Sequence, residues 1–293
     1  MNLVQFSNAF NSQRKCIRHL ESIRWKSGPV CPYCKSTSFS TKKVELRYRC
    51  CSCNRSYSVL VGTLFHASKL PLPVWFVAIY LIKDAKKGIS SLQLSRHLNV
   101  NKNTAWFLQS RIRKAMKEEL FINGIIEVDE TFIGGSTSNM HKTYIEKKGY
   151  YTDGKEHKMT VLGMLERNGS VILEVIPKAN KEFIRPLLKD RINRSSEIIT
   201  DGHGSYVSLK NEFPKHVSLN HKKGERKKGK YHLSTIEGFW ALLKRAVIGT
   251  YHAVSLKHLQ SYMDEIAFKY NHKKENLFNC ILDNLLKSKH AII

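Results

Sequence analysis

The chain has 293 residues, of which 42% are hydrophobic, so it can fold as a globular protein with two or three domains. Forty-nine Lys and Arg residues against 24 Asp and Glu residues give a net charge of +25 at pH 7. This charge excludes an acidic, polycation-binding protein and favours polyanionic partners such as double-stranded DNA, although a merely solvated basic surface would have the same charge.

The N-terminus lacks the pattern of an exported protein. Residues 1–6 contain no basic segment followed by an apolar core, as a secretory signal would. The most apolar stretch, about 70–82, contains Pro71 and Pro73 and is shorter than the roughly 18–20 residues that span a bilayer. We therefore expect a cytoplasmic, nucleoid-associated protein with no membrane partner.

Residues 1–27 have apolar side chains at roughly helical spacing and predict a short helical lead-in. A cysteine-rich module follows over residues 28–62. It contains two Cys-x-x-Cys motifs that are separated by 15 residues. Four thiolates at this spacing typically close a tetrahedral zinc site, so we predict a zinc ribbon whose structural Zn²⁺ is bound by Cys31, Cys34, Cys50 and Cys53.

The alternatives for these cysteines are disulfides or free thiols in a core. Cys51 is the extra thiol of the second motif, so Cys50 and Cys53 form its natural pair. A closed site of four cysteines leaves no position for a substrate, so this zinc would be structural. Basic side chains on the module favour contact with nucleic acid, although a ribbon could equally dock a protein.

Residues 70–120 are predicted to be helical, and residues 90–106 have the pattern of a helix-turn-helix with Asn residues suited to capping at the turn. The second helix, about 102–118, would lie in a DNA major groove. An ordinary helical hairpin is the alternative. The side chains that this helix would present to DNA are Lys102, Asn103, Gln109, Arg111, Arg113 and Lys114.

Short apolar runs alternate with helical patterns over residues 122–275, which predicts an α/β domain with a mixed sheet. The expected strands are 125–133, 159–166, 171–176, 197–201 and 216–219, and the expected helices are 180–192, 203–212, 235–247 and 255–272. Residues 276–293 are expected to form a C-terminal tail.

Two polar loops, 136–158 and 221–230, interrupt this domain. The second loop contains six Lys or Arg residues and one acid, so we expect it to hold the phosphate backbone of DNA. The DNA-binding residues predicted there are Lys222, Lys223, Arg226, Lys227 and Lys228.

Three acidic residues are candidates for a metal site. Asp129 lies within an apolar strand pattern, where an unpaired charge is costly, and Asp201 ends another such pattern. Both can share one edge of a sheet, and Glu237, near the start of a predicted helix, can reach across to them. Mg²⁺ or Mn²⁺ prefers carboxylate ligands and phosphate oxygens, and two such ions suit phosphodiester chemistry.

Neighbouring residues refine this site. Side chains alternate along a strand, so Glu130 is expected on the opposite face, whereas Glu127 shares the face of Asp129 and is a reserve candidate. Lys244 lies seven positions after Glu237 on the same helix face and could contact a phosphate. Trp240 is expected in the core.

Several motifs together resemble a known family over nearly the whole chain. They are Arg24-Trp25 before Cys31-Pro32-Tyr33-Cys34, Val128-Asp129-Glu130-Thr131-Phe132-Ile133-Gly134-Gly135, Thr200-Asp201-Gly202 with Tyr206, Thr235-Ile236-Glu237-Gly238-Phe239-Trp240 with Leu243-Lys244-Arg245, Gly249-Thr250-Tyr251-His252, and Tyr262-Met263-Asp264-Glu265 with Asn271. The chain thereby resembles bacterial insertion-sequence transposases of the ISXO-like group. These proteins join a zinc ribbon to a DDE-type, ribonuclease-H-like domain.

The resemblance implies metal-dependent cutting of DNA at the ends of an element and joining of those ends to target DNA. It implies Asp129 and Asp201 as metal ligands and Lys244 as the family's lysine. The third position varies within the family among Asn, Glu and His, and the place of the family's Asn is taken here by Ser234, a poor ligand. The third ligand is therefore Glu237, His232 or neither.

Two rival functions remain open at this point. One is a catalytically decayed or repurposed DNA-binding protein, and the other is a ribonuclease-H-like nuclease that cuts without joining. For the transposase, the need to bring two element ends together leads us to expect a homodimer or higher oligomer on DNA.

Overall fold

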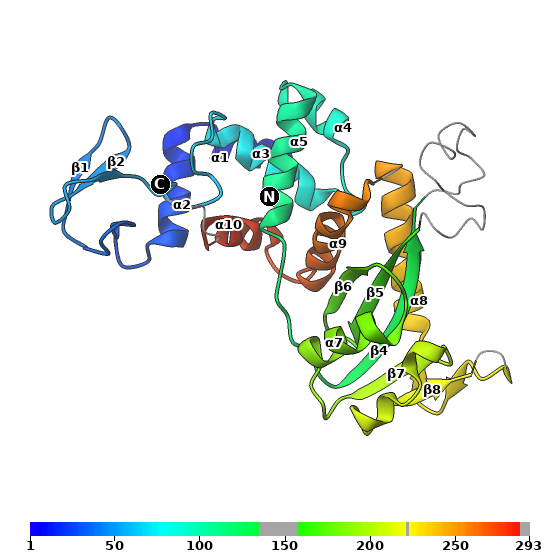
Figure 1. Cartoon of the computed structure of the whole chain (residues 1–293). Coiled ribbons are helices and arrows are strands. Elements are labelled where there is room, and N and C mark those ends of the chain that lie inside the picture. The colour runs from blue at the N-terminus through cyan, green and yellow to red at the C-terminus, as the bar shows by residue number, and fades with distance from the viewer. Residues whose placement is uncertain (135–157, 221–222, 253, 288–293) are drawn as a thin grey trace, which may run out of the picture. The chain divides into compact units, whose positions relative to one another are not determined.

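The structure is a computed structural model, and it describes residues 1–134, 158–220, 223–252 and 254–287. Two compact units make up the chain: Met1–Met116 together with the segment from His272 onward, and Lys117–Asn271 (Figure 1). Residues 136–157 of the first predicted loop, and Lys222 of the second, lie outside the described residues. No helix in the described ranges is long and apolar enough to cross a membrane.

Helices from both ends of the chain build the core of the first unit. Helix α1 (Leu3–Ala9) and helix α2 (Gln13–Arg24) begin at Asn2 and Ser12, whose side chains accept hydrogen bonds from backbone N–H groups three residues on. Helix α10 (Leu277–Lys287) packs against α2 and α3 (Leu72–Asp84). Rings stacked edge to face or tilted fill the space between them, namely Phe6, Phe10, Phe76, Tyr80 and Phe278.

A small antiparallel sheet occupies the cysteine-rich segment. Its strands are β1 (Phe39–Lys42), β2 (Arg47–Cys50) and β3 (Ser56–Tyr57), in that order. Beneath it, Trp25, Tyr48 and Tyr57 pack together with two buried cysteines. So few apolar side chains cannot stabilise a module of this size, which therefore needs a further crosslink.

Helix α4 (Ser91–Leu98) and helix α5 (Lys102–Lys114) are joined by the short turn at Asn99, Val100 and Asn101. Asn99 takes the left-handed conformation that ends α4, and the Asn101 side chain accepts a hydrogen bond of 2.8 Å from the N–H of Asn103. Two residues expected to face DNA do not do so. Gln109 and Arg113 are buried, and the Gln109 amide donates to the Ile89 carbonyl, because both lie on the apolar side of α5.

All five predicted strands of the second unit are confirmed, and they form one mixed sheet. The order is β6 (Val171–Ile176), β5 (Met159–Glu166), β4 (Ile125–Ile133), β7 (Glu197–Asp201) and β8 (Val217–Leu219). The β6–β5 and β5–β4 pairs are antiparallel, whereas β4–β7 and β7–β8 are parallel. Parallel pairing of β4 and β7 brings their C-terminal ends to the same edge of the sheet.

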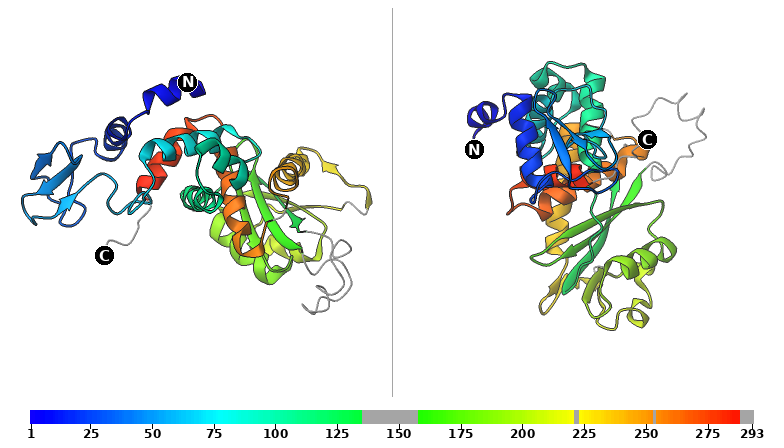
Figure 2. Two further views of the ribbon diagram at one scale, coloured as in Figure 1. Left: turned by 90° about the horizontal axis from the view of Figure 1, so that it is seen from above. Right: turned by 90° about the vertical axis from the view of Figure 1, so that its left-hand side faces the viewer.

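Helices cover both faces of this sheet (Figure 2). Helices α8 (Ser234–Ala246) and α9 (Leu256–Asn271) pack on the face that carries Val161, Leu165 and Ile199. Helix α7 (Lys181–Arg191) packs on the other face, over Ile126 and Val128. The apolar side chains of β4 and β5 are divided between these two cores according to their alternation along each strand.

One predicted helix is wrong. Residues 203–212 form two short 3₁₀ turns, η2 (Gly204–Tyr206) and η3 (Leu209–Asn211), instead of one helix. Between them Ser208 has a φ of 66°, a left-handed conformation that interrupts any continuous helix. The turns still bury Tyr206 and Leu209 against the α7 side of the sheet, which accounts for the helix-like apolar spacing.

Candidate active site and metal centres

Asp129 and Asp201 lie side by side at the junction of β4 and β7. The register pairs Glu127 with Ile199, and two further residues along each strand bring Asp129 level with Asp201 on the same face. Both side chains are half-buried. The backbone N–H of His203 donates a hydrogen bond of 2.9 Å to Oδ1 of Asp201, which fixes the carboxylate of this last residue of β7.

Glu237 approaches these aspartates from the first turn of α8. Burial raises the pKa of Asp129, and the negative charges of Asp201 and Glu237 raise it further. The three carboxylates therefore share one electrostatic environment. Within the described ranges, clusters of metal-ligating atoms that all lie within 4.8 Å of one another do not include this trio, so one ion would not contact all three where they now lie.

Trp240 holds Asp129 in place. It belongs to the core, as expected, and its indole Nε1–H also donates a hydrogen bond of 2.9 Å to Oδ2 of Asp129. This bond favours the ionised form of the carboxylate and partly offsets the effect of burial on the Asp129 pKa. The apolar spacing of α8 indicated burial of Trp240 but gave no sign of this contact.

Gly163, which pairs with Asp129 across β4 and β5, makes room for that indole. A Cβ atom at Gly163 would lie 2.5 Å from Cη2 and 2.6 Å from Cζ2 of Trp240. We expect Gly163→Ala to lower the free energy of unfolding by about 1–3 kcal/mol, because the buried ring has to shift. Denaturant unfolding measures this. The matched control is Gly238→Ala, which has open space in α8 and should be neutral or stabilising; equal stability of both variants would contradict the packing account.

Glu127, the reserve candidate on the same face, is committed to other contacts. Its side chain is fully buried, and its two oxygens accept hydrogen bonds from Arg167, from the backbone N–H groups of Thr235 and Ile236, and from the Thr235 hydroxyl. A carboxylate with these partners has little capacity left to bind a metal ion. Periodicity placed Glu127 on the correct face, but it could not show that α8 starts against it.

His232 lies beside Glu127, at the residues that lead into α8. Its Nδ1 is 2.7 Å from the hydroxyl of Ser234 and 3.7 Å from Oε1 of Glu127. Ser234 is the exposed first residue of α8. His232 therefore contacts both Ser234 and Glu127, whereas Glu237 is the α8 residue whose charge acts on Asp129.

Glu130 faces the other side of the sheet, as the alternation predicted, beside buried Tyr206. Burial, together with the negative charges of Asp129 and Asp201, raises the pKa of Glu130 to about 7, although the Tyr206 hydroxyl lowers it. Glu130 is therefore a fourth acid that interacts electrostatically with Asp129 and Asp201, from the opposite face of the sheet. Its position next to Asp129 was evident from the sequence, but its burial under Tyr206 was not.

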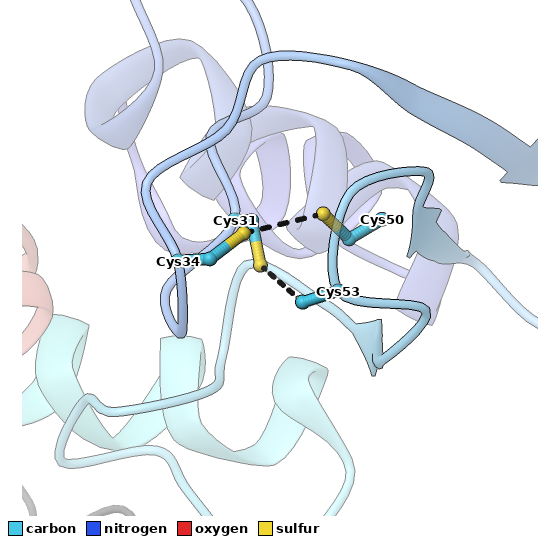
Figure 3. A group of neighbouring side chains, drawn as sticks. All are labelled: Cys31, Cys34, Cys50 and Cys53. Carbon is cyan, nitrogen blue, oxygen red and sulfur yellow. Dashed lines mark hydrogen bonds between the residues drawn. The ribbon is translucent and has the colours of Figure 1, made fainter.

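The four predicted zinc ligands converge in the first unit (Figure 3). The Sγ atoms of Cys31 and Cys53 are 3.7 Å apart, those of Cys34 and Cys50 are 3.5 Å apart, and all four lie within 4.8 Å of one another. A tetrahedral zinc ion with Zn–S bonds of about 2.3 Å requires sulfur separations near these values. The four thiols therefore fit a structural zinc site.

Each motif forms the same turn. The N–H of Lys35 donates to the carbonyl of Cys31, and the N–H of Asn54 donates to that of Cys50, both at 3.0 Å. Lys35 and Asn54 both have positive φ, at 65° and 60°. The backbone N–H of Cys53 lowers the pKa of the Cys50 thiol to about 6, which favours the thiolate that zinc binds. Cys51 is exposed and outside the cluster, so the pairing of Cys50 with Cys53 is the one the fold uses.

A second group of possible metal ligands lies in the first unit, namely His272, Glu275 and Cys280, and its contacts are explained by the local turn. Oε2 of Glu275 lies 3.1 Å from Nδ1 of His272 and accepts a hydrogen bond of 3.3 Å from the thiol of Cys280. Glu275 is exposed. These contacts fix the turn that precedes α10.

The residues predicted to bind DNA lie in both units. Lys102 and Asn103 are exposed at the start of α5, whereas Arg111 is half-buried with its guanidinium near the carbonyls of Leu64 and His66. The second predicted loop is partly a hairpin of β9 (Lys227–Lys228) and β10 (Tyr231–His232). Its described basic residues are exposed, namely Lys223, Arg226, Lys227 and Lys228. Lys244 is also exposed, two helical turns after Glu237 on α8.

Comparison with known proteins places these features in a family. The ISXO2-like transposase domain matches residues 121–271, and the transposase zinc-ribbon domain matches residues 11–56. An uncharacterized protein in the transposable element ISH50 of Halobacterium salinarum is 29% identical over 267 residues, which cover 87% of this chain and 89% of that protein.

Two solved structures also align with the chain. They are a pre-cleavage Mos1 transpososome and the Mos1 strand transfer complex, each 13% identical with a TM-score of 0.27. The first alignment covers 73% of this chain and 76% of the other, and the second covers 72% and 78%. The transposase domain match spans more than half of the sequence and contains Asp129, Asp201 and Glu237. The chain therefore belongs to the ISXO2-like transposase family.

Proposed function

We propose that the chain is a DDE-type DNA transposase in which Asp129, Asp201 and Glu237 hold two divalent metal ions. The observation that carries this proposal is the placement of Asp129 level with Asp201 on one face of the sheet, with Glu237 in the first turn of the helix that packs there. The mixed sheet would then be the ribonuclease-H-like core of the catalytic domain. The two aspartates lie where its parallel strands β4 and β7 meet, and the glutamate reaches them from α8.

The donor set suits Mg²⁺ or Mn²⁺. All three side chains offer carboxylate oxygens, which these cations prefer, and positive charge among them would relieve their mutual repulsion. The ligand atoms of the trio do not all lie within 4.8 Å of one another, which favours two ions over one ion bound by all three. When bound, such a pair activates an attacking oxygen and stabilises a leaving oxygen in phosphodiester chemistry.

The protein orients the acids. Trp240 fixes Asp129, the His203 N–H fixes Asp201, and α8 carries Glu237 as part of a packed helix. Lys244, exposed two turns further along the same helix, is proposed to contact a DNA phosphate. Water would first hydrolyse a phosphodiester bond at the element end and free a 3′-hydroxyl. That hydroxyl would then attack a target phosphodiester and displace the 3′-oxygen of the target strand.

DNA contact is proposed for the β9–β10 hairpin in one unit and for α4 and α5, read as a helix-turn-helix, in the other. The zinc ribbon would assist in binding the element ends. Two ends have to be joined to one target, so a homodimer or higher assembly on DNA is part of the proposal. The predicted boundaries at residues 28–62, 70–120 and 122–275 remain proposals for the division of these tasks.

The hairpin gives a direct test of the DNA contact. Replacing Lys227 and Lys228 by Ala should weaken binding to any DNA sequence and reduce the slope of log K against log salt by about 2, because each phosphate contact releases about one counterion. Fluorescence anisotropy at several salt concentrations measures the slope. The matched control replaces Lys178, which is exposed just before α7, and Lys181, the exposed first residue of α7, and it should leave the slope unchanged. Equal slopes for the two double variants would place the DNA elsewhere.

One assay separates the three candidate functions. The protein is incubated with DNA that carries the element's end, a target plasmid and Mg²⁺ or Mn²⁺. A transposase joins the 3′ end to the plasmid, a nuclease cuts without joining, and a decayed DNA-binding protein only retards the fragment. The last outcome is a specific alternative because Ser234, a poor ligand, stands where the family resemblance implies a possible metal ligand. Metal-dependent joined products are the expected result.

A further inference from the structure

Glu127 and Arg167 form a buried ion pair at the start of α8. Oε1 of Glu127 is 2.7 Å from Nη2 of Arg167, the Glu127 side chain is fully buried, and Arg167 is 18% exposed. Removing one partner of such a pair would leave a buried charge uncompensated, which is strongly unfavourable. Glu127 lies in strand β4 and Arg167 directly follows β5, and both side chains also hydrogen-bond to the segment that precedes and begins α8.

Glu127 caps α8 from a different element. The residue before α8, Leu233, provides no side-chain cap, so the first N–H groups of the helix need another acceptor. Oε2 of Glu127 accepts the N–H groups of Thr235 and Ile236, each at 3.0 Å, and Oε1 accepts the Thr235 hydroxyl at 2.9 Å. A negative charge at this position also interacts favourably with the helix dipole.

Glu127 and Asp129 lie two positions apart on β4, so their side chains share one face of the sheet, and both bind α8. Glu127 binds the helix at Thr235 and Ile236, and Asp129 binds it one turn later through Trp240. Glu237 lies between these two attachments in the chain. Its position relative to Asp129 thus depends on both contacts, and loss of the first would leave the N–H groups of Thr235 and Ile236 without their acceptor.

Arg167 extends the connection to the basic hairpin. Its Nη1 donates to the carbonyl of Lys230 at 2.8 Å, and its Nη2 donates to that of His232 at 3.2 Å. These carbonyls belong to the turn and to strand β10, whose partner β9 carries Lys227 and Lys228. One guanidinium thus joins the hairpin to the carboxylate that caps α8.

We propose that Glu127 and Arg167 are positioning residues that place Glu237 for metal binding and tie the proposed DNA-binding hairpin to the metal site. This inference rests on the proposed function, because it assumes that Glu237 is a ligand. Glu127 itself would not touch the metal or the DNA. Its effect on metal affinity would therefore pass through Glu237.

A double-mutant cycle on Mn²⁺ binding, measured by calorimetry on the full chain, tests this route. We expect Glu127→Gln to weaken Mn²⁺ binding about tenfold, as residues that orient metal ligands commonly do. In a Glu237→Gln background the same change should have little further effect, because the residue it positions is gone. Glu197→Gln is the matched control. Glu197 is also on the sheet, and its ion pair of 2.8 Å goes to Lys230 of the hairpin instead of to α8, so Mn²⁺ affinity should be unchanged.

The outcomes distinguish failure of the proposed metal site from failure of the positioning role of Glu127. Glu237→Gln with unchanged Mn²⁺ affinity would overturn the proposed metal site. Weaker Mn²⁺ binding in Glu237→Gln together with unchanged Mn²⁺ binding in folded Glu127→Gln would overturn only the positioning role. The same conclusion would follow if Glu127→Gln lowered Mn²⁺ affinity equally in the wild-type and Glu237→Gln backgrounds. If Glu127→Gln fails to fold, Thr235→Val removes a single hydroxyl contact and should weaken Mn²⁺ binding about two- to fivefold. Unchanged affinity in that variant would then count against the proposal.

Discussion

Replacing Asp129 by Asn is expected to lower strand transfer by about 10³-fold or more, because several kcal/mol of metal-dependent transition-state stabilisation would be lost. Asn retains an oxygen that can accept the hydrogen bond from Trp240, so the fold around α8 should persist. The change removes the charge at the centre of the carboxylate trio. Binding to element-end DNA should remain close to the wild-type level, because the change leaves the proposed DNA contacts of the basic hairpin and α5 in place.

Joined products are quantified on a gel with pre-cut end DNA and a target plasmid, and binding is followed by anisotropy. Asp190→Asn is the matched control, because Asp190 is exposed on α7, across the sheet from the site. It should transfer strands at the wild-type rate. Retained strand transfer in Asp129→Asn would refute the site, whereas parallel loss of DNA binding would indicate that the variant is misfolded.

Replacing Cys31 and Cys34 by Ser is expected to abolish zinc binding and unfold the module around the three-stranded sheet. The apparent binding free energy of a structural zinc site, about 10–16 kcal/mol, exceeds what the small core of Trp25, Tyr48 and Tyr57 can supply. Elemental analysis should fall from about one zinc per chain to near zero. A chelator should have the same effect on the unaltered protein.

Cys51→Ser provides the control for this prediction. Its thiol is exposed and lies outside the cluster of four, so the variant should retain zinc and its folded ribbon. Cys53→Ser should behave like the double variant. Zinc loss in Cys51→Ser with zinc retained in Cys53→Ser would show that the second motif uses a different pair of thiols.

The strands were predictable because each apolar run has a distinct length and sharp polar boundaries. The prediction of a single helix over residues 203–212 was wrong for a local reason. Tyr206 and Leu209 are spaced like neighbours on a helix, but the left-handed Ser208 divides the segment. The prediction that Gln109 and Arg113 face DNA was wrong because a polar side chain on a helix can be buried when its polar end finds a partner. The Gln109 amide, for example, donates a hydrogen bond to the carbonyl of Ile89.

The candidate site was predictable in part. Alternation along β4 placed Glu127 and Asp129 on one face and Glu130 on the other, and all three lie so. The roles of Glu127 and Trp240 could not be read from the sequence, because both depend on where α8 packs against β4. That packing joins residues more than a hundred positions apart, and no local pattern specifies it.

The most direct test of the proposed two-metal site is a crystal structure of the protein with element-end DNA and Mn²⁺, with the ions located by anomalous scattering. The account predicts two manganese ions that share Asp129 and contact Asp201 and Glu237, with Glu127 still bound to the start of α8. Manganese held by His232 or Ser234 in place of Glu237, or no manganese at Asp129 and Asp201, would contradict it.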